Sequence, residues 1–383
     1  MINRDTRPDS YSRQVIRATC FILMACASSC SSRQAVDFQV HIDKGYNQVF
    51  TRTSGWTGGD IAASVGLSGS RVLWLFGDSW IGPVVAGRHE DAVMIHNAIA
   101  IQRGTAPAAG NVTFYYKNKD GRPVAFFSPP DATGKLWLTG GGIHTVDGLF
   151  LVAAQVVSKP DDTSVFGFET VANWLIHIKN PQQAPEDWHW RMSKIPFFRR
   201  FADGGDISFG APQFIHNGYF YIYGSALRRE TANRYMVLAR APADRLTDFA
   251  AWEFFHQGQW LKNCKQPTYL CDHFGAEYSV SYQPLLKKYV AVYSKDGLSA
   301  EIHLRTAGKP EGPWSNPVLI YTAPEETWSD DYFCYAAKAH PELSAGDNDL
   351  LISYVCNAYD FFKMAADAEI YKPKFIRVSF HSH

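Results

Sequence analysis

Five strongly apolar, aromatic-rich segments recur along this chain, and they constrain its fold more than any other feature. The segments start about 60 to 80 residues apart, and each is short enough to be a buried strand. They are RVLWLFGD (71–78), GLFLVAAQV (148–156), GYFYIYGS (218–225), KYVAVYSK (288–295) and DLLISYVC (349–356). No long amphipathic helical pattern interrupts them. The sequence therefore predicts an all-β protein.

A second set of strand-like segments follows the first. They are MIHNAIAIQ, NWLIHIKN, RYMVLARA, AEIHLRTA and KPKFIRVSF. Turn-forming residues, as in HNGYF and SAGDND, separate the segments. The spacing leaves room for four strands in each unit, which predicts a five-bladed β-propeller of four-stranded antiparallel blades. A β-sandwich with additional strands is the alternative, but it does not explain the regular return of the same strand triplet.

The N-terminus has the pattern of a secretion signal. Several arginines precede the apolar run ATCFILMA, and Leu23-Met24-Ala25-Cys26 resembles the bacterial lipobox, whose cysteine is lipidated. The run is shorter than the roughly 20 residues needed to cross a bilayer. We expect a lipoprotein signal peptide at 1–25, lipidation of Cys26, a tether at 26–48 and a propeller domain at 49–383. The product would be exported and lipid-anchored in the periplasm, outer membrane or cell surface, with soluble secretion as the alternative.

The balance of charge excludes some classes of partner. Lysine plus arginine and aspartate plus glutamate number 37 each, so no global basic field attracts nucleic acid or acidic lipid. Aromatic residues make up 14% of the chain; their flat rings suit a sheet core and also the C–H faces of sugars. We expect a monomer that binds an oligo- or polysaccharide, no nucleic acid, and the membrane only through a lipid anchor.

The cysteines of the expected domain lack the spacing of a zinc site, so we expect no bound metal and no cofactor. A central structural ion such as calcium stays open. Export permits disulfides. Cys264 and Cys271 would close a short loop, whereas Cys334 and Cys356 lie at the two ends of one expected hairpin, as neighbours or as buried thiols.

The strand before each apolar segment is expected to line the central channel of the propeller. These inner-strand candidates are GWTGGDIAASV, KLWLTGGGIHTV, GDISFGAPQFIH, FGAEYSVSYQP and YAAKAHPEL. Their polar side chains include Asp60, His144, Asp206, Glu277, Lys338 and His340. Carboxylates that converge on one channel from several strands indicate a site for paired-carboxylate chemistry.

Cleavage of a glycosidic bond needs one group that protonates the leaving oxygen and another that activates water or attacks the anomeric carbon. Asp60, in its GGD context, is the expected base or nucleophile. Glu277 is the expected general acid, because Phe274 and Tyr278 beside it can raise its pKa by desolvation. Asp206 is the expected third carboxylate, with an orienting or tuning role.

Other polar and aromatic residues are candidates for substrate binding. Antiparallel pairing should bring Asp78 to the same end of the hairpin as Asp60, where we expect Asp78 to act mainly as a brace. Lys338 and His340 lie two residues apart and share one face of their strand. Trp56 is a candidate stacking platform, with a place in the core as the alternative. The full set of expected substrate-binding residues is Trp56, Asp78, Arg88, Asn97, Lys338 and His340.

Several motifs resemble exported bacterial families of unknown function that are related to five-bladed propeller glycoside hydrolases, such as arabinanases and fructosidases. They are GWTGGD with LWLFGDSWIG, HNAIAIQ, GAEYSVSY, AKAHPEL with LLISYVCN, and IYKPKFIRV. One related branch resembles enzymes that cleave D-arabinan internally. The resemblance implies that Asp60 is the base. It places the acid in the third blade, whereas Glu277 begins the expected fourth.

These observations predict an exported glycoside hydrolase that acts on a glycan, with furanosides of the arabinan or fructan type as the expected class. A noncatalytic glycan-binding surface lipoprotein is the main alternative, and a propeller that binds other proteins is a third. The sequence leaves open retention or inversion at the anomeric carbon and internal or terminal cleavage.

Overall fold

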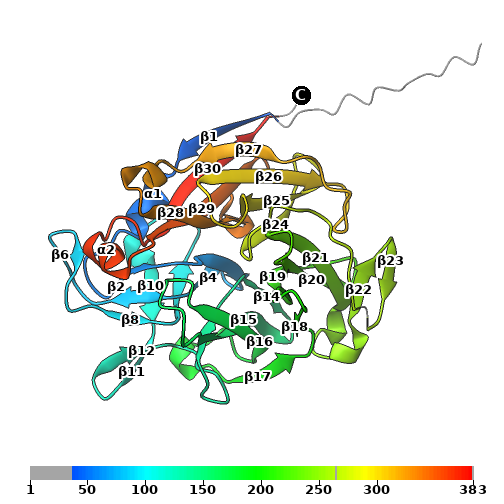
Figure 1. Ribbon diagram of the computed structural model, residues 1–383. Coiled ribbons are helices and arrows are strands. Elements are labelled where there is room, and N and C mark those ends of the chain that lie inside the picture. The colour runs from blue at the N-terminus through cyan, green and yellow to red at the C-terminus, as the bar shows by residue number, and fades with distance from the viewer. Residues whose placement is uncertain (1–36, 264, 382–383) are drawn as a thin grey trace, which may run out of the picture. The chain divides into compact units, whose positions relative to one another are not determined.

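The structure is a computed structural model that describes residues 37–263 and 265–381. Antiparallel sheets dominate this part of the chain, which confirms the all-β prediction (Figure 1). All five apolar segments are second strands of larger sheets, and the segments after them are the third strands. None of the helices in the described part is long and apolar enough to cross a membrane.

Within the described residues, five sheets have four or more strands. The first contains β3 (Ala63–Leu67), β4 (Arg71–Phe76), β9 (Ala98–Arg103) and β10 (Val112–Tyr115). The second contains β13 (Lys135–Trp137), β14 (Gly142–Thr145), β15 (Gly148–Ser158), β16 (Phe168–Ile178) and β17 (Trp190–Ile195). The third contains β18 (Arg199–Arg200), β19 (Asp206–His216), β20 (Tyr219–Arg228), β21 (Asn233–Pro242), β22 (Glu253–His256) and β23 (Gln259–Leu261).

The fourth sheet contains β24 (Tyr278–Gln283), β25 (Lys288–Ser294), β26 (Glu301–Ala307) and β27 (Val318–Thr322). The fifth contains β28 (Tyr332–His340), β29 (Asp349–Ala358), β30 (Lys374–Phe380) and β1 (Phe38–Ile42). The smaller elements are β2 (Trp56–Gly59), β5 (Ser79–Ile81), β8 (Val93–Ile95), β6 (Val84–Val85), β7 (Arg88–His89), β11 (Lys117–Lys119), β12 (Arg122–Val124), α1 (Lys44–Val49) and α2 (Phe361–Ala366).

The inner strands of the five large sheets contact one another in cyclic order. β3 contacts β14, β14 contacts β19, β19 contacts β24, β24 contacts β28, and β28 contacts β3 again. Apolar side chains fill the space between neighbouring sheets. Leu73 of the first sheet and Leu149 of the second share one core cluster, and Val152 of the second and Phe209 of the third share another. Polar groups on the inner strands are therefore brought together from all five sheets.

The N-terminal strand completes the last sheet. β1 pairs with β30 from Phe38↔Phe380 to Ile42↔Ile376, and Arg377 Nε donates to Asp43 Oδ2 at 2.9 Å. The expected tether at 26–48 is therefore wrong for residues 38–48, which contain β1, the N-cap residue Asp43 and most of α1. The strand FQVHI is short and mostly exposed, and it pairs with the edge of the fifth sheet formed by β30. The expected signal peptide and Cys26 lie outside the described residues.

The stretch GWTGGDIAASV is two strands and not the single inner strand that we predicted. β2 pairs with β5 in a small sheet, whereas β3 pairs with β4 in the first sheet. Between them Ile61 and Ala62 adopt left-handed backbone conformations, with φ of 65° and 49°. Such conformations are strained for residues other than glycine and cluster at functional sites. Asp60 sits at this corner.

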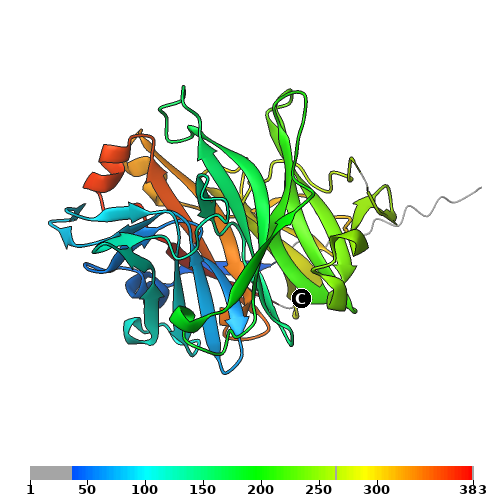
Figure 2. The same ribbon diagram turned by 90° about the horizontal axis from the view of Figure 1, so that it is seen from below.

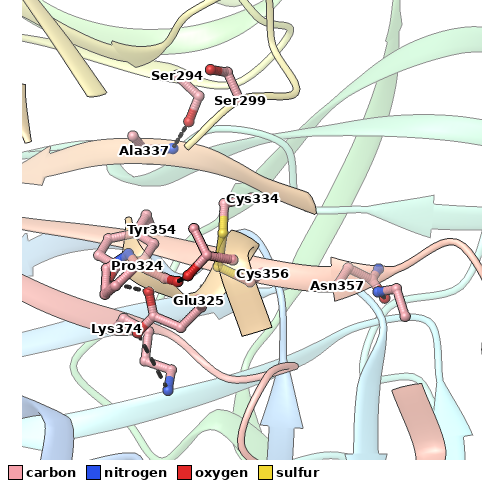
Figure 3. Close-up of a disulfide and its surroundings, with 12 residues drawn as sticks. Ser294, Ser299, Pro324, Glu325, Cys334, Ala337, Tyr354, Cys356, Asn357 and Lys374 are labelled. Atoms are coloured by element: carbon pink, nitrogen blue, oxygen red, sulfur yellow. Dashed lines mark hydrogen bonds and ion pairs between the residues drawn. A yellow bond between two sulfur atoms is a disulfide. The ribbon is translucent and has the colours of Figure 1, made fainter. Parts of the chain in front are cut away.

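A disulfide joins Cys334 of β28 to Cys356 of β29 (Figure 3). The two residues are direct partners in the strand register and are almost completely buried. From the sequence, the two cysteines could be either neighbours or simply buried thiols. The structure shows that they form a disulfide. Cys271 is buried, and Cys264 lies outside the described residues.

Candidate active site

A cavity of about 460 Å³ lies at the centre of the ring of inner strands. Strands of the second, third and fifth sheets line it, together with the segments that precede or follow strands of the first and fourth sheets. Two long hairpins, β15–β16 and β20–β21, extend its walls and project on the same side of the sheets (Figure 2). The three expected catalytic carboxyl groups, Asp60, Asp206 and Glu277, all line it. The other lining residues that matter for the chemistry are Asp78, Trp137, Phe166, Arg234, Phe333, Tyr335 and Tyr371.

Asp60 is fixed by its neighbours on two sides. The Tyr335 hydroxyl donates to Asp60 Oδ2 at 2.8 Å. The backbone of Asp60 pairs with the second aspartate of the hairpin, since its N–H donates to the carbonyl of Asp78 at 3.3 Å. This confirms that both aspartates lie at the same end of the hairpin. A Cβ atom at Gly77 would clash with Asp60 Oδ1, so glycine is required there.

The surroundings of Asp60 disfavour its negative charge. Burial, the charge of Asp78 and the charge of Glu277 raise the pKa of Asp60 to about 8, against the opposing effect of hydrogen bonds from Tyr335 and Tyr371. Among the described residues, Asp60 Oδ1 is buried and has no hydrogen-bond partner. Crowded carboxyl groups with different protonation states are a common arrangement for acid–base catalysis. At neutral pH this cavity keeps a proton on Asp60.

Glu277 is held by a buried cation. Lys338 Nζ lies 2.9 Å from Glu277 Oε2 and also donates to the carbonyl of Ile61. Lys338 is only 3% exposed and does not line the cavity, so its expected contact with substrate is wrong. Lys338 instead positions Glu277, because its ammonium group contacts both the Glu277 carboxylate and the carbonyl of Ile61, the residue after Asp60.

A β-bulge explains how β28 supplies both Tyr335 and Lys338 to the centre. Residues three apart on a regular strand point to opposite faces. Here the register against β29 shifts between these two residues, and Ala336 adopts a left-handed φ of 61°. The extra residue re-aims the strand. Tyr335 therefore reaches Asp60 while Lys338 reaches Glu277.

Asp206 is the first residue of β19, the inner strand of the third sheet, and it lines the cavity. Arg234 Nη1 lies 3.9 Å from Asp206 Oδ1 and donates to Ser225 Oγ at 2.9 Å. Burial raises the pKa of Asp206, and the positive charge of Arg234 opposes this increase. The prediction that Asp206 joins the other two carboxyl groups in one cavity agrees with this placement.

Asp78 both lines the cavity and braces it. Trp137 Nε1 donates to Asp78 Oδ1 at 2.9 Å, and His96 Nδ1 lies 3.2 Å from the same oxygen. Arg88 is not a partner, because it lies exposed on the β6–β7 hairpin and away from the cavity lining. Asn97 is completely buried and donates to the carbonyls of neighbouring chain segments, Phe127 and Leu136, at 2.9 Å each. The expected substrate contacts of Arg88 and Asn97 are therefore wrong.

Trp56 and His340 are core residues. Trp56 is 1% exposed and stacks on Phe114 with ring centroids 4.6 Å apart, so it offers no platform to a ligand. His340 is completely buried between the hydroxyls of Ser64 and Ser353, at 2.5 and 2.8 Å. Burial and the charge of Lys338 lower its pKa to about 3, so the ring stays neutral. Both expected substrate-binding roles are wrong.

Sequence reasoning missed several cavity residues. Tyr335 stands three residues before Lys338, where strand alternation predicts the opposite face, and Tyr371 lies in a loop. Trp137 was inside a predicted inner strand and was not singled out. Within residues 37–263 and 265–381, no group of three or more His, Cys, Asp or Glu side chains is arranged to hold a metal ion. The absence of a metal stays a prediction.

Residues 43–381 match the model of a family described as a domain of unknown function, DUF5005. None of the curated proteins matches the chain. A crystal structure from Bacteroides ovatus ATCC 8483, provisionally described as a hydrolase, is similar at 18% identity and a TM-score of 0.69, covering 91% of this chain and 94% of that one. At this identity the likeness shows a shared fold.

Two weaker likenesses are to enzymes that act on sugars. A levansucrase mutant from B. megaterium has 11% identity and a TM-score of 0.48, covering 90% of this chain and 89% of that one. A GH43 β-xylosidase/α-arabinofuranosidase from a compost metagenome, in complex with xylotriose, has 12% identity and a TM-score of 0.43, with coverages of 91% and 96%. Scores of this size do not by themselves establish a common fold.

Proposed function

The chain belongs to the DUF5005 family, and from the chemistry of its central cavity we propose that it is an exported glycoside hydrolase with a five-bladed β-propeller fold. The cyclic contacts of the inner strands and the pairing of β1 with β30 support the five blades. Radial closure of this kind leaves few free sheet edges. We also propose that the exported chain is a monomer anchored by a lipid on Cys26.

One observation carries the assignment: two carboxyl groups in the same cavity occupy different electrostatic environments. Asp60 has a pKa of about 8, whereas Glu277 is ion-paired with Lys338. A hydrolase that breaks an acetal needs a protonated and an ionised carboxyl group at once. A protein that only binds sugar has no comparable need for a carboxyl group kept protonated at neutral pH.

The electrostatics favour roles opposite to those expected from the sequence. Asp60 donates its proton to the leaving glycosidic oxygen as the bond from that oxygen to the anomeric carbon breaks. Glu277 either takes a proton from the attacking water or attacks the anomeric carbon itself, and water then releases the sugar. In both cases the water supplies the proton that restores Asp60 to its starting state, directly or through Glu277. Asp206 and Asp78 keep the cavity negative and orient its polar groups.

The cavity supports a neutral glycan as the substrate. Five carboxyl groups line it, from Asp60, Asp78, Asp206, Glu277 and Asp296. Because Asp60 keeps a proton and Glu277 is paired with Lys338, the other three carboxyl groups remain against the single guanidinium of Arg234 among the described lining residues. A uronic acid would be repelled by this excess of negative charge. The rings of Trp137, Phe166 and Phe333 are suited to the C–H faces of a sugar. Furanosides of the arabinan or fructan type are the class that the motif resemblance favours.

The proposal is tested by incubating the chain with arabinans, fructans and aryl furanosides and separating the products by chromatography. We expect products from the wild type and from Arg88→Ala, the matched control outside the cavity. We expect none from Asp60→Asn on the polymers, with circular dichroism unchanged. Equal products from the wild type and Asp60→Asn on the polymers would remove Asp60 from the reaction. Binding without products in all variants would favour a noncatalytic glycan-binding protein.

A further inference from the structure

The loop between β15 and β16 reaches from the second sheet to the fifth. Its Phe166 packs on Phe333 of β28 with ring centroids 5.6 Å apart, and on Tyr359 at 6.2 Å. The second and fifth sheets are not neighbours in the cyclic order of inner strands, because the first sheet lies between them. The loop therefore borders the cavity on the side of the first sheet, where Asp60 lies between β2 and β3. We call residues 159–167 the strap.

The strap is an ordered turn with its own hydrogen bonds. Lys159 N–H donates to the Gly167 carbonyl at 2.8 Å, which closes the base of the loop. Asp162 Oδ1 accepts from the hydroxyl of Ser164 at 2.6 Å and from its N–H at 3.1 Å. A Cβ at Gly167 would clash with the carbonyl of Asp162, so only glycine lets the loop turn this tightly. The N–H of Phe166 joins this network by donating to Ser164 Oγ at 3.3 Å.

Phe166 is a wall of the cavity as well as a bridge across it. Its side chain lines the cavity and remains 37% exposed, whereas Phe333 beneath it is 4% exposed. Phe333 also packs on Tyr335 with centroids 5.6 Å apart, and Tyr335 holds Asp60. The aromatic wall therefore adjoins the carboxyl group that would donate the proton.

A wall at this place limits how a glycan can lie. A chain cleaved internally must leave the cavity on both sides of the reacting bond, but the contact of Phe166 with Phe333 and Tyr359 closes one side. We propose that Phe166 confines the site to the end of a neutral glycan, so that the enzyme releases terminal units. This inference rests on the proposed hydrolase activity and adds to it a specificity-determining residue.

The test uses arabinan- and fructan-type oligosaccharides from disaccharide to hexasaccharide, labelled at the reducing end, with product sizes read early in the reaction. We expect the wild type to release terminal units only. Phe166→Ala should produce internal fragments and raise the ratio of kcat/KM for the hexasaccharide over the disaccharide about tenfold, an effect of roughly 1.4 kcal/mol. Phe166→Tyr should keep the wild-type pattern, because it preserves the aromatic contact. Phe362→Ala is the matched control, since Phe362 is 81% exposed and does not line the cavity.

The outcomes separate this inference from the proposed function. If the wild type cleaves but Phe166→Ala, folded by circular dichroism, gives the same product sizes and the same ratio, the role of Phe166 is refuted while the hydrolase assignment stands. Internal fragments from the wild type would also refute it. If neither protein cleaves any oligosaccharide, the hydrolase assignment fails and this inference fails with it.

Discussion

Replacing Asp60 by asparagine should stabilise the fold at alkaline pH. The pKa of Asp60 rises from 3.8 to about 8 in the folded protein, so the folded chain keeps a proton that the unfolded chain has lost. Stability therefore falls as pH rises from about 4 to about 8. Asparagine has the same shape, can still accept the Tyr335 hydrogen bond, and does not titrate. The variant should lose this pH dependence.

The size of the effect follows from the span of the shift. About four pH units between 3.8 and about 8 correspond to an upper limit of roughly 5 to 6 kcal/mol, at 1.36 kcal/mol for each unit. Asp60 is partly open to the cavity and shares its repulsion with two other carboxyl groups, so screening reduces the gain to about 1–3 kcal/mol. A gain of this kind is typical when a strained functional group is removed.

Urea unfolding of wild type and Asp60→Asn, near pH 4 and above pH 8, measures the difference. Asp203→Asn is the matched control of opposite sign. The N–H of Gly205 at 2.9 Å and the guanidinium of Arg228 at 3.1 Å lower the pKa of Asp203 to about 2, so its loss should destabilise the fold above pH 8. Equal stability of Asp60→Asn and wild type above pH 8 would refute the raised pKa.

Three further predictions concern single side chains. Tyr335→Phe removes the hydroxyl that donates to Asp60, so the pKa of Asp60 should rise further. A hydrogen bond to a charged group is worth about 1.5–3 kcal/mol, so the pH–rate profile should shift by about 1–2 pH units. An unchanged profile would contradict that contact. Trp56→Ala should lower the free energy of unfolding by about 3–5 kcal/mol, measured by urea titration, because Trp56 is buried in the core. Loss of sugar binding with unchanged stability would contradict a core role for Trp56. Cys26→Ser should move the chain from the membrane fraction to the soluble fraction of cells, and retention in the membrane would refute lipidation at Cys26.

The second strand of every large sheet was predictable because it is buried along most of its length and is a nearly continuous apolar run. The third strands were predictable because each is an apolar-rich segment that follows a second strand after a turn. The strand β1 was not, since FQVHI is only five residues long and its partner lies at the other end of the chain. The closure of the fifth sheet is a property of the whole fold rather than of a local pattern.

Three of the carboxyl groups that line the cavity, those of Asp60, Asp206 and Glu277, were predictable because each lies at or next to the start of an inner strand and follows small residues. Their partners were not. The bulge at Ala336 reverses the alternation that sequence reasoning uses, so Tyr335 was missed and Lys338 was given a contact with substrate. The sequence does not show whether a polar or aromatic side chain near an active site contacts substrate or other protein groups. For this reason substrate-binding roles were wrongly predicted for Trp56, Asn97 and His340.

The division of labour between Asp60 and Glu277 is tested most directly with two substrates that differ in their leaving group. The nitrophenolate of a nitrophenyl furanoside departs without being protonated, whereas the departing sugar oxygen of a glycan needs a proton donor. We predict that Asp60→Asn loses cleavage of the glycan and retains cleavage of the nitrophenyl furanoside, and that Glu277→Gln loses both. Cleavage of the glycan by either variant at the wild-type rate would contradict the account.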